Sequence, residues 1–535
     1  MNQKNNDGST ALISAAFFSH PDLVQALLDH GADKNIRNNA GATALSVVEG
    51  PWEMMKPIYD MVGGMLAPLG LVLDYERIQS ARPKIADMLR NVGNTAQVKK
   101  PITTVSTDPD FIVETLAPSG DEQYLNVDSE YIFDQTRLPT FELRIPGSAY
   151  AKLDSAPADE EYVEGSLTFE GETISPVKIR YKGSVGAWAG GISGANPFEP
   201  SGHKIRTKLS IKIKFNGLGS TNKFYGLNKL QLHSQNLDPS QLRERLGYWL
   251  FREMGVPAPR SVHARLVING KFSGLYALTE QIDGRFTRHH FDEGKGNLYK
   301  EVWPLNADGH AQNEAAYISK LKTNEDEDPS VNLIQTFANE IAAASDTDVP
   351  EIISRWMNVG EIVSFAAVDR AIRNDDGPFH WYVFGGFTTN HNFYWYEEPT
   401  KKQHHLIPWD LDNAFENIIS NANPVTPIAD AWGKVRASCE PFNYGPFNIQ
   451  QRSASCDKLT KGWASFEEEY ATQKARLIDG PLSAKQCNAQ LDAWVSQIRE
   501  ATIEASTTHH DAISLATWEH AVSQLKDQLQ FARTH

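Results

Sequence analysis

Three short polar motifs, two of them acidic, lie close together in the sequence and have the residue types of a cation-binding site. They are Asn374-Asp375-Asp376-Gly377, His391-Asn392 and Trp409-Asp410-Leu411-Asp412-Asn413. Carboxylate and amide oxygens are the ligands that a hard cation such as magnesium prefers, and magnesium usually shares them with phosphates. The motifs therefore predict a metal site. The alternative interpretation is that the first motif is an ordinary turn and that Asp410 or Asp412 is a helix N-cap.

Two basic segments upstream of these motifs have residues that could contact phosphates. Lys182-Gly183-Ser184-Val185-Gly186 follows a predicted strand and leads into a glycine-rich stretch, and free backbone N–H groups in such a loop can cover phosphates. In the strand predicted over 209–215, Lys212 and Lys214 lie on the face opposite the apolar residues. Either lysine could reach nucleotide phosphates and pair with Glu244 on the following helix, as a strand lysine and a helix glutamate do in kinases. A common glycine loop and a solvated strand face are the simpler alternatives.

The elements that must position these residues change type along the chain. Alternating apolar residues predict strands over 141–145, 166–169, 177–181, 209–215, 261–269 and 274–282. One helix is predicted among them, from Pro239 to Met254, with Asp238 as its N-cap. After about residue 310 the pattern is mostly helical, with short strands at 391–396 and 403–408. The sequence predicts an α+β fold in which a strand-rich lobe precedes a helical lobe.

The N-terminal part carries an internal repeat. The segment around Thr10-Ala11-Leu12 recurs 33 residues later around Thr43-Ala44-Leu45, which is the period of ankyrin repeats. A further helix is predicted over 75–89, whereas residues 91–138 are rich in Thr, Pro, Asp and Ser. We therefore expect an ankyrin-repeat segment at 1–95, a linker at 96–138, the strand-rich lobe at 139–290 and the helical lobe at 291–535.

Charge and composition narrow the classes of partner and compartment. The 535 residues carry a formal net charge of −16, which opposes binding to nucleic acid or to an anionic membrane. No apolar stretch is long enough to predict a membrane span, and residues 2–9 lack the pattern of a secretory signal. The location is open: secreted, periplasmic or at the cell surface if a signal was removed, and cytoplasmic otherwise. A disulfide between Cys439 and Cys456 and three free thiols are both compatible with the three cysteines.

From Phe141 to at least Phe415 the chain resembles the spore coat protein H (CotH) kinase family, an atypical branch of the protein kinase-like fold. The resemblance depends on ordered motifs: Arg180-Tyr181-Lys182-Gly183, Ile211-Lys212-Ile213-Lys214-Phe215, Phe224-Tyr225-Gly226-Leu227, Glu280-Gln281-Ile282-Asp283, His391-Asn392-Phe393-Tyr394 and Ile407-Pro408-Trp409-Asp410-Leu411-Asp412. It implies a two-lobed fold and phosphorylation of Ser or Thr, in a protein partner or in the chain itself, with ATP and magnesium or manganese as cofactors.

The resemblance also implies a role for each matching residue. Asp376, with Asp375 as its rival, would accept the proton of the substrate hydroxyl. Asp410 would bind magnesium, with Asn392 and Asp412 as further ligands or supports. The remaining implied roles are an ion pair between Lys214 and Glu244, a phosphate-covering loop at Lys182, Gly183 and Ser184, and an adenine-binding hinge from Glu280 to Ile282.

The sequence departs from the family pattern at two places. The loop Lys182-Gly183-Ser184-Val185-Gly186 replaces the usual Arg-Gly-Asn-Ser-Ser, and Asp375 stands where relatives often carry an apolar or aromatic residue.

The ankyrin segment would recruit a protein partner or substrate. A non-catalytic binding or adhesion protein and a transferase of nucleotidyl or other groups are the alternatives. A glycosyltransferase using Asp410-Leu411-Asp412 fits the layout less well.

Overall fold

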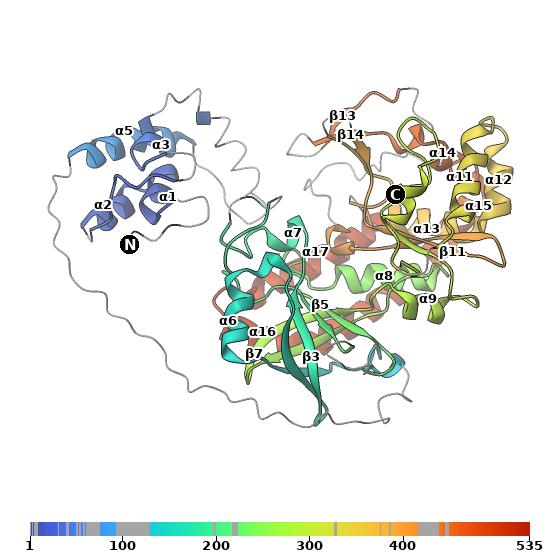
Figure 1. Cartoon of the computed structure of the whole chain (residues 1–535), viewed down its shortest axis with the longest axis horizontal. Coiled ribbons are helices and arrows are strands. Elements are labelled where there is room, and N and C mark those ends of the chain that lie inside the picture. Colours follow the sequence, from blue (N-terminus) through green and yellow to red (C-terminus); the bar gives the residue numbers. More distant parts are fainter. Residues whose placement is uncertain are drawn as a thin grey trace. The chain divides into compact units, whose positions relative to one another are not determined.

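The computed structural model (Figure 1) describes residues 129–534 apart from 195, 197–198, 217–222, 326–328, 375, 385–386, 416–437 and 445–448. Nearer the N-terminus it describes residues 2, 4, 9–29, 31–38, 42–49, 52, 55–56, 59 and 75–91. The chain divides into two compact units, of which the first comprises 1–114, 146–161 and 181–206 and the second comprises 115–145, 162–180 and 207–535. Asp375 and most of the predicted linker lie outside the described residues.

Short helices form the described N-terminal part of the first unit. They are α1 (Ala11–Phe17), α2 (Pro21–Asp29), α3 (Ser46–Glu49) and α5 (Tyr75–Asn91). Thr10 begins α1 as its N-cap, because its hydroxyl accepts a hydrogen bond from the backbone of Ile13. Leu12, Val24 and Leu89 are buried in one apolar cluster, so α5 contributes to the same small core as the first two helices.

The same unit also contains two helices from later in the sequence, one before and one after residues 162–180, which belong to the second unit. These are α6 (Gly147–Ser155) and α7 (Val185–Trp188). Gly183 precedes α7, and a Cβ at this position would lie 2.5 Å from the Cβ of Ala187. Close packing therefore requires glycine at the start of α7.

A closed barrel with strand order β1-β2-β3-β4-β5-β7-β6 forms the strand-rich part of the second unit. Its strands are β1 (Thr140–Arg144), β2 (Val163–Phe169), β3 (Glu172–Tyr181), β4 (Ile211–Lys214), β5 (Lys229–His233), β6 (Ser261–Ile268) and β7 (Lys271–Thr279). Parallel pairing of β1 with β6 closes the barrel. The predicted turn at Asn269-Gly270 joins β6 to β7, and both residues have positive φ, which the turn of a tight hairpin requires.

Helix α8 (Arg243–Glu253) starts later than the pattern predicted. Asp238 accepts hydrogen bonds from the backbone of Ser240 at 2.9 Å and of Arg243 at 2.8 Å. This carboxylate therefore stabilises a turn over residues that were predicted to be helical, and the helix begins only where the turn ends.

Two small sheets accompany the helices that follow the barrel. One has the order β12-β11-β8 and the other has the order β10-β9-β14-β13. Their strands are β8 (Leu298–Lys300), β9 (Trp381–Phe384), β10 (Phe387–Thr389), β11 (Phe393–Glu398), β12 (Gln403–Pro408), β13 (Phe442–Tyr444) and β14 (Ile449–Arg452). The predicted strands at 391–396 and 403–408 correspond to β11 and β12, whereas the sheet that contains β9 was not predicted.

Helices make up most of the remaining chain and surround a large apolar core. They are α9 (Gly284–His290), α10 (Glu314–Ile318), α11 (Asn332–Ala343), α12 (Val349–Trp356), α13 (Val359–Ala371), α14 (Lys458–Trp463), α15 (Glu467–Asp479), α16 (Ala484–Thr508) and α17 (Leu515–Thr534). Trp395, Trp463, Trp494 and Trp518 are fully buried in this core. Helix α13 packs against α15, and α16 lies along β7 of the barrel (Figure 1). The mixture of a barrel and a helical region agrees with the predicted α+β class.

Among the described residues, no helix is long and apolar enough to cross a membrane. A disulfide joins Cys439 to Cys456, and Cys487 is buried as a free thiol. The structure thus selects one of the two cysteine interpretations that the sequence left open.

Candidate active site

The loop after α13 has a conformation that local contacts fix tightly. The amide group of Asn374 donates to the carboxylate of Asp369 at 2.8 Å. A Cβ at Gly377 would lie 2.3 Å from that same amide nitrogen, so this turn needs glycine. Asp376 therefore lies between Asn374 and Gly377, two residues whose positions these contacts fix.

The carboxylate of Asp376 accepts hydrogen bonds from four side chains. Oδ1 accepts from the hydroxyl of Tyr382 at 2.8 Å and pairs with Nε2 of His391 at 2.7 Å. Oδ2 accepts from the amide groups of Asn392 at 3.0 Å and Asn413 at 3.3 Å. A carboxylate has about four acceptor sites, so all of them are used and the side chain is held in one orientation.

These partners favour the ionised form of Asp376. Burial opposes ionisation, but His391 and the hydrogen bonds outweigh it, so the pKa of Asp376 lies below its usual value. Burial would lower the pKa of His391, yet the neighbouring carboxylate raises it overall. The two shifts agree in describing a charge-assisted pair.

The second acidic motif turns sharply after β12. Asp410 has a φ of 57°, in the left-handed region, which Asp tolerates better than most residues. Its backbone N–H donates to the buried hydroxyl of Tyr248 on α8 at 3.0 Å. On the same helix, a Cβ at Gly247 would lie 2.8 Å from Leu411. The absence of a side chain at Gly247 thus allows the turn to approach α8.

Negative charge accumulates at this turn. Burial comes first in raising the pKa of Asp412 well above its usual value, followed by the charge of Asp410. Glu244, Asp376 and Asp238 raise it further. Arg243 contacts the turn, but its side chain donates to the backbone carbonyl of Asp412 at 3.3 Å and lies 3.5 Å from the carboxylate of Asp238. Additional positive charge would stabilise such a cluster.

This donor set fits a magnesium or manganese ion that shares its ligands with phosphates. Within the described ranges, no three His, Cys, Asp or Glu side chains converge as they would around an ion held entirely by protein. Magnesium commonly uses one or two carboxylates and completes its coordination with phosphates and water. Asp410 and Asp412 are suited to that arrangement by residue type and by their position in the same turn.

Asn392 connects the two acidic motifs. Its side-chain amide donates to Asp376, and its backbone carbonyl accepts from the N–H of Trp409, which precedes Asp410. Asn392 itself has a φ of 62°. Three predicted site residues are therefore brought together, with Asn392 between Asp376 and the Asp410 turn.

Lys214 and Glu244 both belong to the described part of the chain, and they do not form the predicted ion pair. Glu244 instead pairs with His233 at 2.8 Å and accepts from Thr279 at 3.1 Å. Lys214 lies opposite Lys229 in the β4–β5 register, at the far end of β5 from His233. Four residues of strand span about 13 Å, so the register separates Lys214 from Glu244. Lys212, opposite Gln231, lies between these ends.

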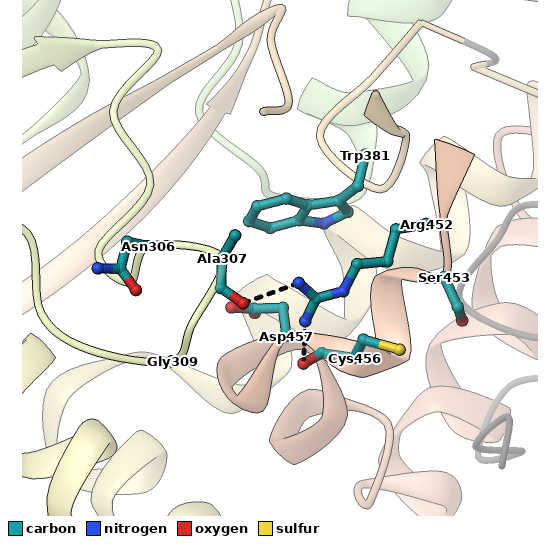
Figure 2. Close-up of a pocket in the computed structure, with 8 residues that line it drawn as sticks. All are labelled: Asn306, Ala307, Gly309, Trp381, Arg452, Ser453, Cys456 and Asp457. Carbon is teal, nitrogen blue, oxygen red and sulfur yellow. Dashed lines mark hydrogen bonds between the residues drawn. The ribbon is translucent and has the colours of Figure 1, made fainter. Parts of the chain in front are cut away.

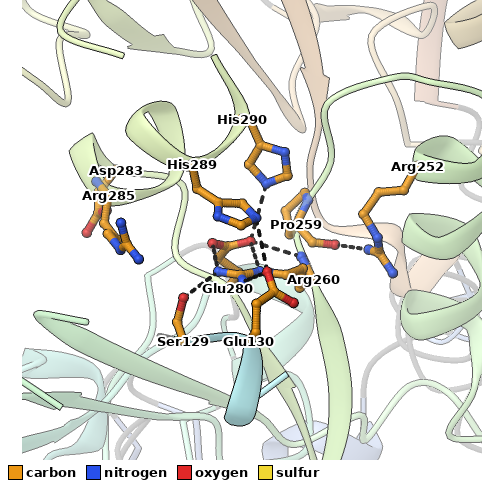
Figure 3. A network of polar contacts seen from close by, with 10 residues as sticks. All are labelled: Ser129, Glu130, Arg252, Pro259, Arg260, Glu280, Asp283, Arg285, His289 and His290. Atoms are coloured by element: carbon orange, nitrogen blue, oxygen red, sulfur yellow. Dashed lines mark hydrogen bonds and ion pairs between the residues drawn. The ribbon is translucent and has the colours of Figure 1, made fainter. Parts of the chain in front are cut away.

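Glu280 was predicted to belong to a hinge that meets adenine, and its side chain contacts Arg260 and His290 (Figure 3). Its carboxylate accepts from the side chain of Arg260 at 2.5 Å and 3.0 Å, and His290 lies 3.5 Å away. Burial raises its pKa, but His290 and Arg260 lower it to about 2 overall. The backbone N–H of Glu280 also donates to Arg260. Glu280 thus stabilises the ends of β6 and β7, while Ile282 is buried in an apolar cluster with Trp409.

The predicted phosphate-covering residues Lys182, Gly183 and Ser184 belong to the first unit. The backbone N–H of Gly183 donates to the carboxylate of Glu160 at 3.0 Å, within the same unit. A role in covering phosphates stays a prediction.

A small pocket lies apart from all of these predicted residues (Figure 2). Arg452 fills one side of it and donates to the backbone carbonyls of Ala307 at 2.7 Å and Cys456 at 3.0 Å. Trp381 lines it from β9. Because the guanidinium group of Arg452 is already hydrogen-bonded to the protein, we assign the pocket no role in the site.

Sequence reasoning missed most of the groups that hold Asp376. No role in holding Asp376 was predicted for Tyr382, Asn413 or His391. The motifs His391-Asn392 and Asp412-Asn413 contained the only available signal, namely side-chain donors next to predicted site residues. Nothing in the sequence indicated that β9 would bring Tyr382 to the same carboxylate.

Comparison with known proteins places this geometry in a family. The model of the CotH kinase protein family matches residues 179–534. The chain belongs to the CotH kinase protein family. An ankyrin-repeat model matches residues 7–39, which confirms the first copy of the predicted repeat; the second copy, around Thr43, stays a prediction.

Two proteins of Bacillus subtilis (strain 168) are similar to parts of the chain. An inner spore coat protein H-like protein is 43% identical over 51 residues, which cover 10% of this chain and 17% of that protein. Inner spore coat protein H is 24% identical over 200 residues, which cover 35% of this chain and 50% of that protein. The chain therefore matches half or less of the length of these relatives.

Proposed function

We propose that this CotH family member is an ATP- and magnesium-dependent protein kinase with a two-lobed, kinase-like fold. The observation that carries the proposal is the link through Asn392 between an oriented carboxylate, Asp376, and the turn that contains the carboxylates of Asp410 and Asp412. Phosphoryl transfer needs an oriented acceptor for the hydroxyl proton and a separate cation site for the phosphates. The two motifs supply one of each.

The protein side of the reaction divides between these motifs. Asp376 orients the acceptor hydroxyl and receives its proton as the bond to phosphorus forms. Asp410 and Asp412, with Asn392 as support, hold a magnesium or manganese ion, which when bound neutralises charge on the ATP phosphates. Asn392 keeps the distance between the two carboxylate sites constant. Asp375, in the same loop, is the alternative proton acceptor.

The nucleotide contacts need a different assignment from the usual kinase pattern. The Lys214–Glu244 pair is not among the contacts of Glu244, so Lys212, Lys214 or the Lys182 loop would bind phosphates without that glutamate. The ankyrin repeat supports a protein partner, because stacked repeats present extended binding surfaces. We propose that this segment recruits the protein substrate.

The missing ion pair also favours a second candidate, a non-catalytic binding or adhesion protein on the same fold. In ordinary kinases the lysine–glutamate pair must be in place for activity. The two candidates differ in whether ATP is consumed, which makes them separable in one assay.

The test is incubation of the full chain with magnesium or manganese and ATP labelled separately at the γ and α phosphates, alongside Asp410→Asn. Label from the γ position on protein, lost in the variant, would support the kinase. Label from the α position would indicate nucleotidyl transfer instead. No label together with no ATP-induced rise in melting temperature would contradict an enzyme and support the binding protein.

A further inference from the structure

Tyr382 holds a hydroxyl group at the position where Asp376 would meet its substrate. Of the four side chains that donate to Asp376, three donate through nitrogen and only Tyr382 donates through oxygen. An alcohol or phenol oxygen is the nucleophile of protein phosphorylation. The hydrogen bond of 2.8 Å from Tyr382 to Oδ1 is the contact that a substrate hydroxyl makes with a proton acceptor before transfer.

The backbone around Tyr382 keeps this hydroxyl in place. Tyr382 lies in β9, opposite Thr389 on β10 and opposite Gln451 on β14. Its ring stacks on His391, with ring centroids 4.9 Å apart. Strand pairing on both sides fixes the backbone of Tyr382, and the stacked ring of His391 restricts its side chain. A side chain that is already restricted loses little freedom when it reacts, which favours an intramolecular transfer.

Burial determines from which side Tyr382 can be reached. The residue is only 6% exposed, so a separate enzyme has little access to it in the folded chain. Asp376 retains 19% side-chain exposure. Asn392 donates to Asp376 and accepts from the backbone N–H of Trp409, the residue before Asp410, so the proposed cation site lies close to the carboxylate that Tyr382 contacts.

We propose that Tyr382 is an autophosphorylation site, modified within its own chain by the proposed kinase activity. The O–H bond of Tyr382 breaks and its proton passes to Oδ1 of Asp376. The phenolic oxygen forms a bond to the γ-phosphorus of ATP, and the bond from that phosphorus to the bridging oxygen breaks, releasing ADP. This inference rests on the proposed function, because ATP is the phosphoryl donor.

The phosphorylated residue would then change the site. A phosphate adds about −1.5 to −2 charges at neutral pH, next to a region that already holds Asp376, Asp410 and Asp412. The modified side chain would no longer donate to Asp376, which would leave Oδ1 with His391 as its remaining partner. The modification thus vacates the acceptor position for a hydroxyl from another protein.

The experiment incubates the full chain with magnesium and γ-labelled ATP, with and without an added acceptor protein, and locates phosphate by tandem mass spectrometry. We expect phosphotyrosine at position 382, formed at a rate independent of protein concentration. Tyr382→Phe should lose this label while keeping the ATP-induced rise in melting temperature. Tyr317→Phe is the matched control, because Tyr317 is equally buried in the second unit but donates to the carbonyl of Pro304; its labelling should equal that of the wild type.

Three results would contradict the inference or its premise. Label confined to other residues and unchanged in Tyr382→Phe would overturn the inference and leave the kinase proposal standing. Faster transfer to the added acceptor in Tyr382→Phe, with no phosphate on Tyr382 in the wild type, would show that this residue only occupies the acceptor position. No γ label on either the chain or the acceptor would overturn the proposed function itself.

Discussion

The Asp376 loop and the Asp410–Asp412 turn are both partly buried and acidic, yet their surroundings are opposite. Asp376 accepts four hydrogen bonds and has a lowered pKa. Asp412 is crowded by other carboxylates and has a raised pKa. The first environment is complete without further charge, whereas the second one is incomplete without a cation.

This difference explains how one short stretch of sequence can supply two functions. Hydrogen-bond donors such as Asn392 and Tyr382 fix a carboxylate in a reactive orientation, while an excess of carboxylates creates a site for a metal ion. The nature of the neighbours, rather than the acidic residue itself, determines the role. Substitutions in the two motifs should therefore have different consequences.

The largest effect is expected for Asp410→Asn. Asn tolerates the left-handed backbone of residue 410, so the fold should be retained while one of the two metal-binding carboxylates is lost. Transfer of the γ phosphate should fall by about 10³-fold or more, measured as initial rates at saturating magnesium. A variant that folds normally and keeps the wild-type rate would show that Asp410 does not bind the ion.

Asp376→Asn should lower both activity and stability. The amide group would place a donor against donors, so some hydrogen bonds to residue 376 would be lost at a cost of about 1–3 kcal/mol in the free energy of unfolding. Transfer should fall by about 10²- to 10⁴-fold. Chemical denaturation and rate measurements on the same preparation check both effects, and unchanged stability would contradict the four-donor arrangement.

Glu397 on β11 sharpens the comparison, because it resembles Asp412 in its raised pKa but not in its neighbours. Burial is the leading cause that raises the pKa of Glu397 to about 7, from the usual 4.5 of a glutamate. The resulting stability is present below pH 4.5 and is lost as the pH rises through about 7.

Glu397→Gln should remove this loss, since the amide oxygen can still accept from Asn297. At pH 8 the variant should be more stable than the wild type by about 1–3 kcal/mol, and the two should converge near pH 4.5. Melting curves across this range check the prediction. Glu468→Gln, at an exposed position on α15, is the control and should follow the wild type; the same behaviour in Glu397→Gln would contradict the assignment.

The smallest effect is expected for Asp412→Asn in the absence of metal. Removing one of several crowded negative charges should raise the free energy of unfolding by on the order of 1 kcal/mol, opposite in sign to Asp376→Asn. The magnesium-dependent stabilisation should decrease in the same variant. Thermal melts with and without magnesium measure both, and a loss of stability in metal-free buffer would argue against charge crowding at the turn.

Much of the fold could be predicted from local patterns, because alternation and repeat period are properties of neighbouring residues. Six of the seven barrel strands, the Asn269-Gly270 turn and the ankyrin repeat follow from such patterns, whereas β5 was not predicted. Alternation also gave the face of Lys214, but it cannot give the strand register, and the register separates Lys214 from Glu244. Local patterns likewise could not show that Arg260 binds Glu280.

The candidate site was predicted only in part for the same reason. Asp376, Asn392 and Asp410 were predicted together because each belongs to a short motif of chemically active residues. Tyr382 and Asn413 join them through tertiary contacts of β9 and of the turn after β12. Long-range pairing of this kind leaves no periodic signal in the sequence.

The most direct test of the central claim is the binding of ATP and magnesium to the full chain, measured by isothermal titration calorimetry for the wild type, Asp376→Asn and Asp410→Asn. The two motifs are assigned different roles, so Asp376→Asn should bind magnesium and ATP with the affinity of the wild type, although it transfers phosphate far more slowly. Asp410→Asn should lose the magnesium-dependent part of binding. Equal losses of binding in both variants, or wild-type binding in Asp410→Asn, would contradict the division of roles between the two acidic motifs.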